Sequence, residues 1–201
     1  RVLMKSIVAN NGHFDEDHFR KAYVQFMTTE GSHNDTYAST CHRMFFANMI
    51  FDKKEPKDCP DNDGHNVDAI DGLILPTITA LAETARQLST TSGNNNVQLS
   101  EESKRAIQEA AARTAAVTRS SRILENASMA WANLVSAALV TPRNEGSAEN
   151  EMNQHIIEVA QSLGLGAPSP NRRDQMRYVS KLNYATIVTL QVHLFNFTFF
   201  V

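Results

Sequence analysis

The sequence predicts an all-α fold, built as a single domain of about six packed helices. Apolar residues recur at helical spacing almost everywhere before the C-terminal tail, and no convincing strand pattern interrupts them. A chain of 201 residues, 42% of them hydrophobic, can bury one sizeable core without disulfides or metal ions. The sequence contains no heptad seam, no glycine-rich phosphate loop and no internal repeat. These observations favour one helical domain over a coiled coil or a repeat array.

Helices in the first half of the chain are indicated by apolar spacing and by their end signals. The opening stretch RVLMKSIV has the spacing of a helix. Asp15 can cap a helix that runs through Met27, with apolar side chains along one face. A further helix is expected over Tyr37–Phe51, and the charged, proline-containing segment DKKEPKDCPDND ends it. The next helix, over Val67–Leu88, is expected to be kinked or split at Pro76, because the proline ring removes an internal hydrogen bond.

Three more helices are expected after the polar insert STTSGNNNVQ. Ser100 can cap the alanine-rich segment EESKRAIQEAAARTAAV, whose acidic first turn suits the helix dipole and whose alanines imply close packing. The next helix covers Arg122–Val140 around Trp131, and the last covers Ala148–Leu163 and ends at Gly164. The tail YATIVTLQVHLFNFTFFV is apolar, β-branched and aromatic, so it is expected to be a strand or a segment foreign to the fold.

The apolar faces of these helices predict one hydrophobic core. The side chains expected in it are Phe19, Tyr23, Phe26, Phe45, Ile70, Leu73, Ile78, Leu81, Ile107, Val117, Trp131, Leu134 and Ile156.

Charge and composition argue against several function classes. With 19 Lys and Arg against 22 Asp and Glu, the chain has no electrostatic footprint for nucleic acid. The apolar tail is too short and too interrupted by polar residues to be a membrane helix of about 20 residues. The two cysteines, Cys41 and Cys59, fit neither a disulfide framework nor a metal motif, which favours free thiols in a reducing compartment. We therefore expect a cytoplasmic protein without nucleic-acid or membrane partners.

Two segments each place a His-Asn pair and a carboxylate at the start of an expected helix. Helix N-termini offer free amide groups and a partial positive charge, which suit phosphate or ribose recognition. In the alternative reading, the asparagines and aspartates are helix caps that contribute about 0.5–2 kcal/mol to stability. The candidate residues are Ser32, His33, Asn34 and Asp35 in GSHND, and Gly64, His65, Asn66 and Asp68 in DGHNVD.

Ligand spacing argues against dedicated metal loops. An EF-hand alignment with Gly64 at position 6 puts Cys59 at position 1 and Ile70 at position 12, where oxygen ligands are required. The histidines lie too far from any paired cysteine or histidine to match a zinc site. Asp68 and Asp71, three residues apart, would share a helix face. They either hold a hard cation such as Mg2+ or form a solvated acidic face.

A basic residue, Arg119, follows Thr118 at the junction of two expected helices. An arginine there can bind a phosphate or a carboxylate through two parallel hydrogen bonds. Alternatively, it is a last-turn cation favoured by the helix dipole.

Four strings, taken in order, resemble the middle of ADP-ribosylglycohydrolase-like proteins, most closely the crystallin J1 branch. They are VLMKSIVANNGHFDEDHFRKAYVQFM, GSHNDTY, DGHNVDAIDGLILPTITALAE and AAVTRSSRILENASMAWANLVSAAL, within roughly Val2–Leu163. The resemblance implies a single-domain orthogonal helical bundle of that type. It also implies Mg2+-assisted hydrolysis of the ribosyl glycosidic bond of ADP-ribosylated substrates, with paired ions that orient ribose hydroxyls and a water. The GHNVD string occupies the position of the family's substrate loop, so Gly64, His65, Asn66 and Asp68 would face ADP-ribose.

The resemblance does not extend to the family's metal ligands. These lie in acidic motifs near the two ends of the family domain, and neither motif is found in this chain. We therefore expect a domain truncated at both ends over residues 1–170, a C-terminal segment over 171–201, and no glycohydrolase turnover by this chain alone. Because the crystallin J1 branch also serves structural roles, the alternative is a non-catalytic structural or ligand-binding protein. A monomer is expected in either case.

Overall fold

The computed structural model describes residues 1–32, 37–62, 70–90, 99–140, 154–159 and 161. The chain divides into two compact units, Arg1–Met152 and Asn153–Val201. The described residues are mostly helical and contain no strand, so the all-α prediction is confirmed. In the second unit, residues 154–159 are helical. The domain boundary expected between residues 170 and 171, and the apolar tail, lie outside the described residues.

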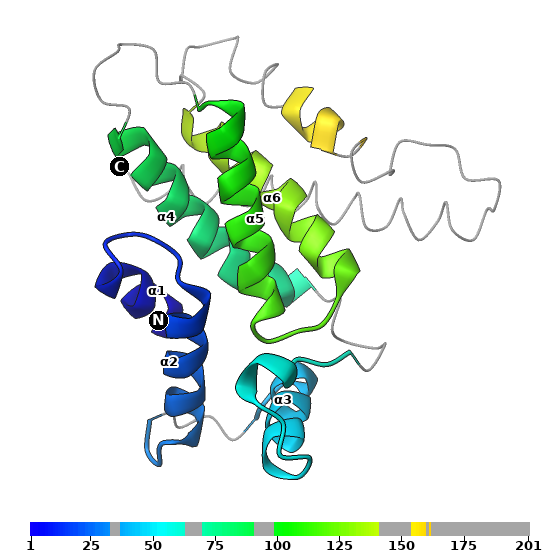
Figure 1. Ribbon diagram of the computed structural model, residues 1–201. Coiled ribbons are helices and arrows are strands. Elements are labelled where there is room, and N and C mark those ends of the chain that lie inside the picture. The colour runs from blue at the N-terminus through cyan, green and yellow to red at the C-terminus, as the bar shows by residue number, and fades with distance from the viewer. Residues whose placement is uncertain (33–36, 63–69, 91–98, 141–153, 160, 162–201) are drawn as a thin grey trace, which may run out of the picture. The chain divides into compact units, whose positions relative to one another are not determined.

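The described part of the first unit consists of α-helices and two 3-10 helices (Figure 1). In chain order its described elements are α1 (Val2–Ala9), α2 (Glu16–Thr28), α3 (Thr40–Ile50), η1 (Pro56–Asp58), η2 (Ile70–Leu73), α4 (Ile74–Thr90), α5 (Glu101–Ala116) and α6 (Arg122–Val140).

Two predicted helix caps are confirmed by hydrogen bonds. The Asp15 carboxylate accepts from the backbone N–H of His18 at 2.8 Å, and the Ser100 hydroxyl accepts from the backbone N–H of Ser103 at 3.1 Å. Each bond satisfies one of the N–H groups that a helix start leaves without a partner.

Of the two outcomes predicted for Pro76, the kink is wrong and the split is closer, because η2 and α4 divide the described part of this segment and Pro76 lies in the first turn of α4. Backbone N–H groups of the first turn have no partner inside the helix, so a proline there costs no hydrogen bond. The 3-10 helix η2 precedes it. Pro76 therefore marks the start of α4 rather than a kink within a longer helix.

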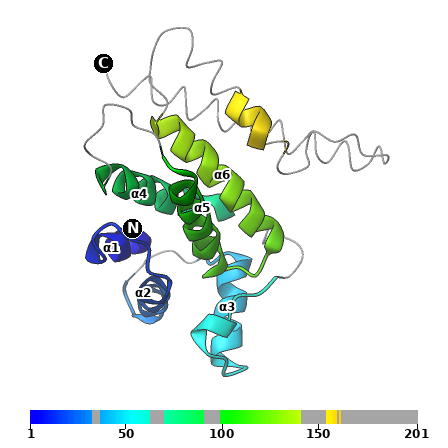
Figure 2. The ribbon, with the colours of Figure 1, turned by 45° about the horizontal axis from the view of Figure 1, so that its top comes forward.

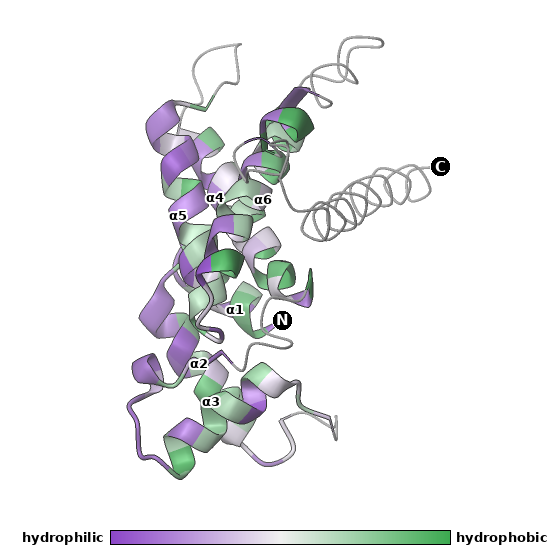
Figure 3. Ribbon diagram, turned by 90° about the vertical axis from the view of Figure 1, so that its right-hand side faces the viewer, coloured by the Kyte–Doolittle hydropathy of each residue, from purple (hydrophilic) through white to green (hydrophobic). Residues whose placement is uncertain are grey.

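Helices α4, α5 and α6 pack closely against one another, and Figures 1 and 2 both show them side by side. Alanines lie at their contacts, with Ala80, Ala111 and Ala132 fully buried in one cluster. Small side chains allow helix backbones to approach closely, as the alanine-rich sequence of α5 predicted. The outer side of α5 carries its charged residues and is hydrophilic (Figure 3).

A second cluster lies where α2 meets α3, and it is aromatic. The rings of Tyr23 and Phe45 meet edge-on with centroids 5.2 Å apart, and those of Phe45 and Phe46 lie 5.1 Å apart. Phe19 and Phe14 continue the cluster toward α1. Edge-to-face ring contacts stabilise such clusters by about 0.5–1.5 kcal/mol per pair beyond the area they bury.

The predicted core is correct in part. Phe19, Tyr23, Phe45, Ile107 and Val117 are buried. They belong to two clusters, however, rather than to one core.

Two predicted core residues, Ile70 and Leu81, are each 42% exposed and were wrongly assigned. The buried face of α4 instead carries Thr79, Glu83 and Thr84. These polar side chains can lie inside because each finds a hydrogen-bond partner there. Another predicted core residue, Ile156, is half-buried in the second unit.

Helix α6 is long and apolar enough to cross a membrane by length and composition alone. Its Leu124, Ser128 and Ala132 are nevertheless buried within the first unit. In the structure α6 packs against α4 and α5, as a core helix of a helical domain does.

Candidate functional site

Arg119 lies in the short connection between α5 and α6. The backbone N–H groups of Thr118 and Arg119 both donate to the Ala115 carbonyl, at 3.3 and 3.2 Å, and so close the end of α5. The Ser121 hydroxyl then accepts from the backbone N–H of Leu124 at 3.1 Å and starts α6. This tight connection holds the base of the Arg119 side chain inside the protein, where the side chain is only 7% exposed.

The guanidinium of Arg119 forms a two-pronged ion pair with Asp71. Its Nη2 donates to Asp71 Oδ2 at 2.7 Å and its Nη1 donates to Asp71 Oδ1 at 3.2 Å. Hydrogen bonds from Arg119 hold the pKa of Asp71 below its usual value. Burial by itself lowers the pKa of Arg119, but the bond to Asp71 and the nearby Cys41 outweigh this and raise it. The pair is therefore charged across the physiological pH range.

Gly72 leaves the space in which the guanidinium lies. A Cβ at this position would stand 3.0 Å from Arg119 Nη1 and 2.8 Å from the methyl carbons of Leu124. A larger residue would thus displace either the ion pair or the start of α6. The local sequence Asp-Gly therefore supplies both the carboxylate and the room for its partner.

The neighbouring residue Ser120 bonds to the segment that follows η1, at Asp61. Its backbone N–H donates to the Asp61 carbonyl at 3.2 Å. The Asp61 carboxylate accepts from the Asn48 side-chain amide at 3.1 Å, and this bond is the main reason that the pKa of Asp61 is lowered. In the sequence, Asp61 precedes the segment 63–69 and Asp71 follows it. Both residues are held at the α5–α6 connection, Asp61 by Ser120 and Asp71 by Arg119.

The start of α3 also reaches Arg119. The buried Cys41 lies near enough to Arg119 to contribute to its raised pKa, and the Cys41 sulfur lies 3.1 Å from the Ser39 hydroxyl. The adjacent His42 ring meets Tyr23 of α2, with 2.8 Å between the Tyr23 hydroxyl and His42 Nδ1. Burial, and then the positive charge of Arg119, lower the pKa of His42, and burial raises that of Tyr23. In the neutral tautomer that carries its proton on Nε2, His42 Nδ1 accepts a hydrogen bond from the Tyr23 hydroxyl.

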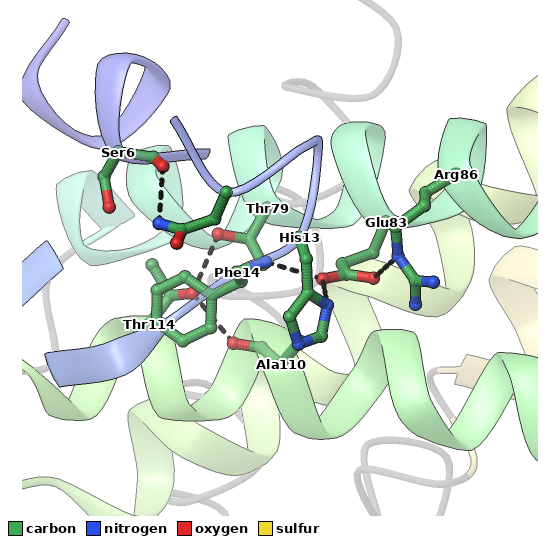
Figure 4. A network of polar contacts seen from close by, with 9 residues as sticks. Ser6, His13, Phe14, Thr79, Glu83, Arg86, Ala110 and Thr114 are labelled. Carbon is green, nitrogen blue, oxygen red and sulfur yellow. Dashed lines mark hydrogen bonds and ion pairs between the residues drawn. The ribbon is translucent and has the colours of Figure 1, made fainter. Parts of the chain in front are cut away.

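A separate polar cluster surrounds Glu83 of α4 (Figure 4). The 2% exposed carboxylate accepts from the Phe14 backbone N–H at 2.7 Å and from Arg86 Nε at 2.8 Å, and His13 Nδ1 lies 2.8 Å away. Because protein groups engage both carboxylate oxygens, this cluster fastens the α1–α2 loop to α4. Its role is structural.

Most of the predicted substrate-binding residues lie outside the described residues. These are His33, Asn34, Asp35, Gly64, His65, Asn66 and Asp68. Ser32 is described, and its hydroxyl donates to the Phe26 carbonyl, so it closes the turn that follows α2. The N-cap residue of α3 is Ser39, and the helix begins three residues later than predicted, at Thr40. The ligand assignments for both segments stay predictions.

The structure bears on two alternatives that the sequence left open. Arg119 binds a carboxylate through two hydrogen bonds, so it is more than a last-turn cation. Asp71 is the partner of that arginine and its side chain is 49% exposed, whereas Asp68 lies outside the described residues. Sequence reasoning missed this pairing because 48 residues separate the two side chains. The only available signal was an arginine at a helix junction.

Within the part of the chain that the structure describes, no group of three or more His, Cys, Asp or Glu side chains could hold a metal ion. Both described cysteines, Cys41 and Cys59, are buried and free, as predicted. The described donors thus do not fit the magnesium site that the family resemblance implies, since Asp71 is engaged by Arg119.

No protein-family model, curated protein or solved structure matches the chain. The resemblance to ADP-ribosylglycohydrolases therefore rests on the sequence strings alone.

Proposed function

We propose that this chain supplies the ADP-ribose-binding segments of an ADP-ribosylglycohydrolase-like protein, which hydrolyses the ribosyl glycosidic bond of ADP-ribosylated substrates. One observation carries the proposal. Asp61 and Asp71, which flank the second His-Asn segment in the sequence, are both held at the connection between α5 and α6. The Asp61 carbonyl accepts from the Ser120 N–H, and the Asp71 carboxylate pairs with Arg119.

Such an arrangement supports a binding role for the second segment. A binding site formed by loops needs rigid supports close to the loop ends, since a misplaced contact group loses much of its effect. The buried ion pair and the packed α4–α5–α6 helices provide such supports. The imidazole and amide side chains of His65 and Asn66 would then contact ribose hydroxyls or phosphate oxygens.

The proposal takes no chemical step through Mg2+, because the described donors do not fit that ion. In the proposed reaction Mg2+ would orient ribose hydroxyls and a water, with ligands that the described residues do not supply.

Calorimetric titration with ADP-ribose tests the proposal. We expect weak binding that Asn66→Ala abolishes, whereas Asn126→Ala, on the exposed surface of α6, leaves it unchanged. Binding that is equal in both variants would contradict the assignment of the second segment. An assay with ADP-ribosylated peptides, with and without Mg2+, then separates a binding chain from an active one. We expect no turnover by this chain alone.

The second candidate function is a non-catalytic structural or ligand-binding protein of the crystallin J1 type. The Arg119–Asp71 pair favours it, because the pair commits Asp71 to stabilising the helical connection. A chain that binds no ADP-ribose but remains folded and monomeric would support this candidate.

A further inference from the structure

The two partners of the Arg119–Asp71 pair differ greatly in exposure. The Arg119 side chain is 7% exposed, whereas that of Asp71 is 49% exposed. The carboxylate is thus the member of the pair that meets solvent. Asp71 also belongs to η2, a 3-10 helix of four residues, so its position depends on little regular structure.

A phosphate group can take the place of the carboxylate in a pair of this geometry. A guanidinium binds carboxylate and phosphate with the same pair of parallel N–H donors. The distances of 2.7 and 3.2 Å show that both prongs of Arg119 are directed at Asp71. An anion arriving from solvent would find both donors in place once the carboxylate moved aside.

The surroundings of Arg119 favour such an exchange. Moving the Asp71 carboxylate away from the buried guanidinium is costly, and an anion that takes its place offsets that cost. Burial, and then the positive charge of Arg119, lower the pKa of the nearby His42. The negative charge of Asp71 acts to raise the pKa of Arg119 and also that of His42, where burial and Arg119 outweigh it.

We propose that Arg119 is an exchangeable anion site, on which the diphosphate of ADP-ribose replaces the Asp71 carboxylate. Asp71 is then an internal competitor that holds the site together when no nucleotide is bound. This inference rests on the proposed function for the identity of the nucleotide, but the exchange can be tested with inorganic pyrophosphate alone.

The test compares pyrophosphate binding by the full chain and three variants, using calorimetry. Asp71→Asn removes the competing charge and keeps the side-chain shape. We expect it to bind pyrophosphate about tenfold or more tightly than the wild type, a difference of roughly 1.4 kcal/mol. Arg119→Gln should abolish binding. Arg105→Gln, on the exposed side of α5, should leave it unchanged and so controls for general attraction to basic residues.

Each outcome supports or contradicts the replacement of the Asp71 carboxylate by pyrophosphate at Arg119. Equal affinity of Asp71→Asn and the wild type overturns it, as does equal loss in Arg105→Gln and Arg119→Gln. Circular dichroism checks that each variant is folded. Should either site variant fail to fold, the wild type still decides, because absence of pyrophosphate binding at millimolar concentration overturns the proposal and binding that excess acetate displaces supports it.

The proposed function and the exchange fail in different ways. Pyrophosphate binding that depends on Arg119, in a chain that does not bind ADP-ribose, supports the anion site and contradicts the proposed function. ADP-ribose binding that depends on Asn66 but is unchanged in Asp71→Asn and Arg119→Gln supports the function and overturns the exchange.

Discussion

The contact between α2 and α3 and the contacts among α4, α5 and α6 are built in opposite ways. The first joins large rings, with Tyr23 and Phe45 in edge-on contact. The second joins alanines and paired hydroxyl groups, such as Thr79 with Thr114. Large rings keep helix backbones apart, and here they surround polar groups such as the Tyr23 hydroxyl. Small residues let helix backbones approach closely. Arg119, at the end of α5, lies near enough to the aromatic contact for its charge to help lower the pKa of His42, after burial.

Removing the central ring of the aromatic contact should have the largest effect. Phe45 is fully buried, so Phe45→Ala should lower the free energy of unfolding by about 3–5 kcal/mol through lost apolar burial and a cavity. Chemical denaturation measures this loss. Phe51→Ala, at an 80% exposed position just after α3, should change stability by less than about 0.5 kcal/mol. Similar losses in both variants would show that the aromatic contact is not a packed core.

Enlarging a small residue should break the other contact. Ala132 of α6 is fully buried, so Ala132→Leu should lower the free energy of unfolding by about 1–3 kcal/mol through overpacking. Ala138→Leu, on the exposed side of the same helix, serves as the control and should have little effect. An Ala132→Leu variant as stable as the wild type would mean that α6 does not approach its neighbours so closely.

The hydroxyl pairs contribute less, and a double-mutant cycle can isolate one. Thr114 donates its proton to the Ala110 carbonyl at 2.8 Å, so Thr79 must donate to Thr114, also at 2.8 Å. Thr79→Val should therefore cost about 1 kcal/mol and leave Thr114 with its other bond. The coupling energy between Thr79→Val and Thr114→Val, measured by denaturation, should be of the same order. Strictly additive losses would argue against the pair.

The smallest expected effect concerns His42, which contacts the Tyr23 hydroxyl at the aromatic contact between α2 and α3. Burial, and then Arg119, hold the pKa of His42 below the unfolded value of about 6.5, although Asp71 opposes this. As pH falls, the unfolded chain takes up this proton first. Stability is thus fully present above about pH 6.5 and declines as pH falls toward the folded pKa.

Replacing His42 by asparagine should remove this part of the pH dependence. The asparagine side chain can still accept the Tyr23 proton through its oxygen, so the contact with α2 is kept. Thermal unfolding at a series of pH values checks the result. A variant whose midpoint declines as steeply as that of the wild type would place the titrating group elsewhere.

The sequence predicted local features more reliably than it predicted which residues are buried. Asp15 and Ser100 cap helices as expected, because capping depends only on residues within one turn. Leu81 is exposed and Glu83 is buried, contrary to simple hydrophobic patterning. Glu83 can lie inside because the backbone of Phe14, 69 residues earlier, reaches it. No pattern within α4 contains that information.

The sequence by itself determined the helical fold class and the caps of two helices, and it also showed that both cysteines are free thiols. Helical periodicity, cap chemistry and cysteine spacing are local properties of the chain, so they can be read without knowing what packs where. Only the tertiary structure decided that Arg119 binds Asp71, that Pro76 opens α4 and that the buried residues form two clusters. Those outcomes depend on contacts between residues far apart in sequence, and such contacts exist only after the helices have packed.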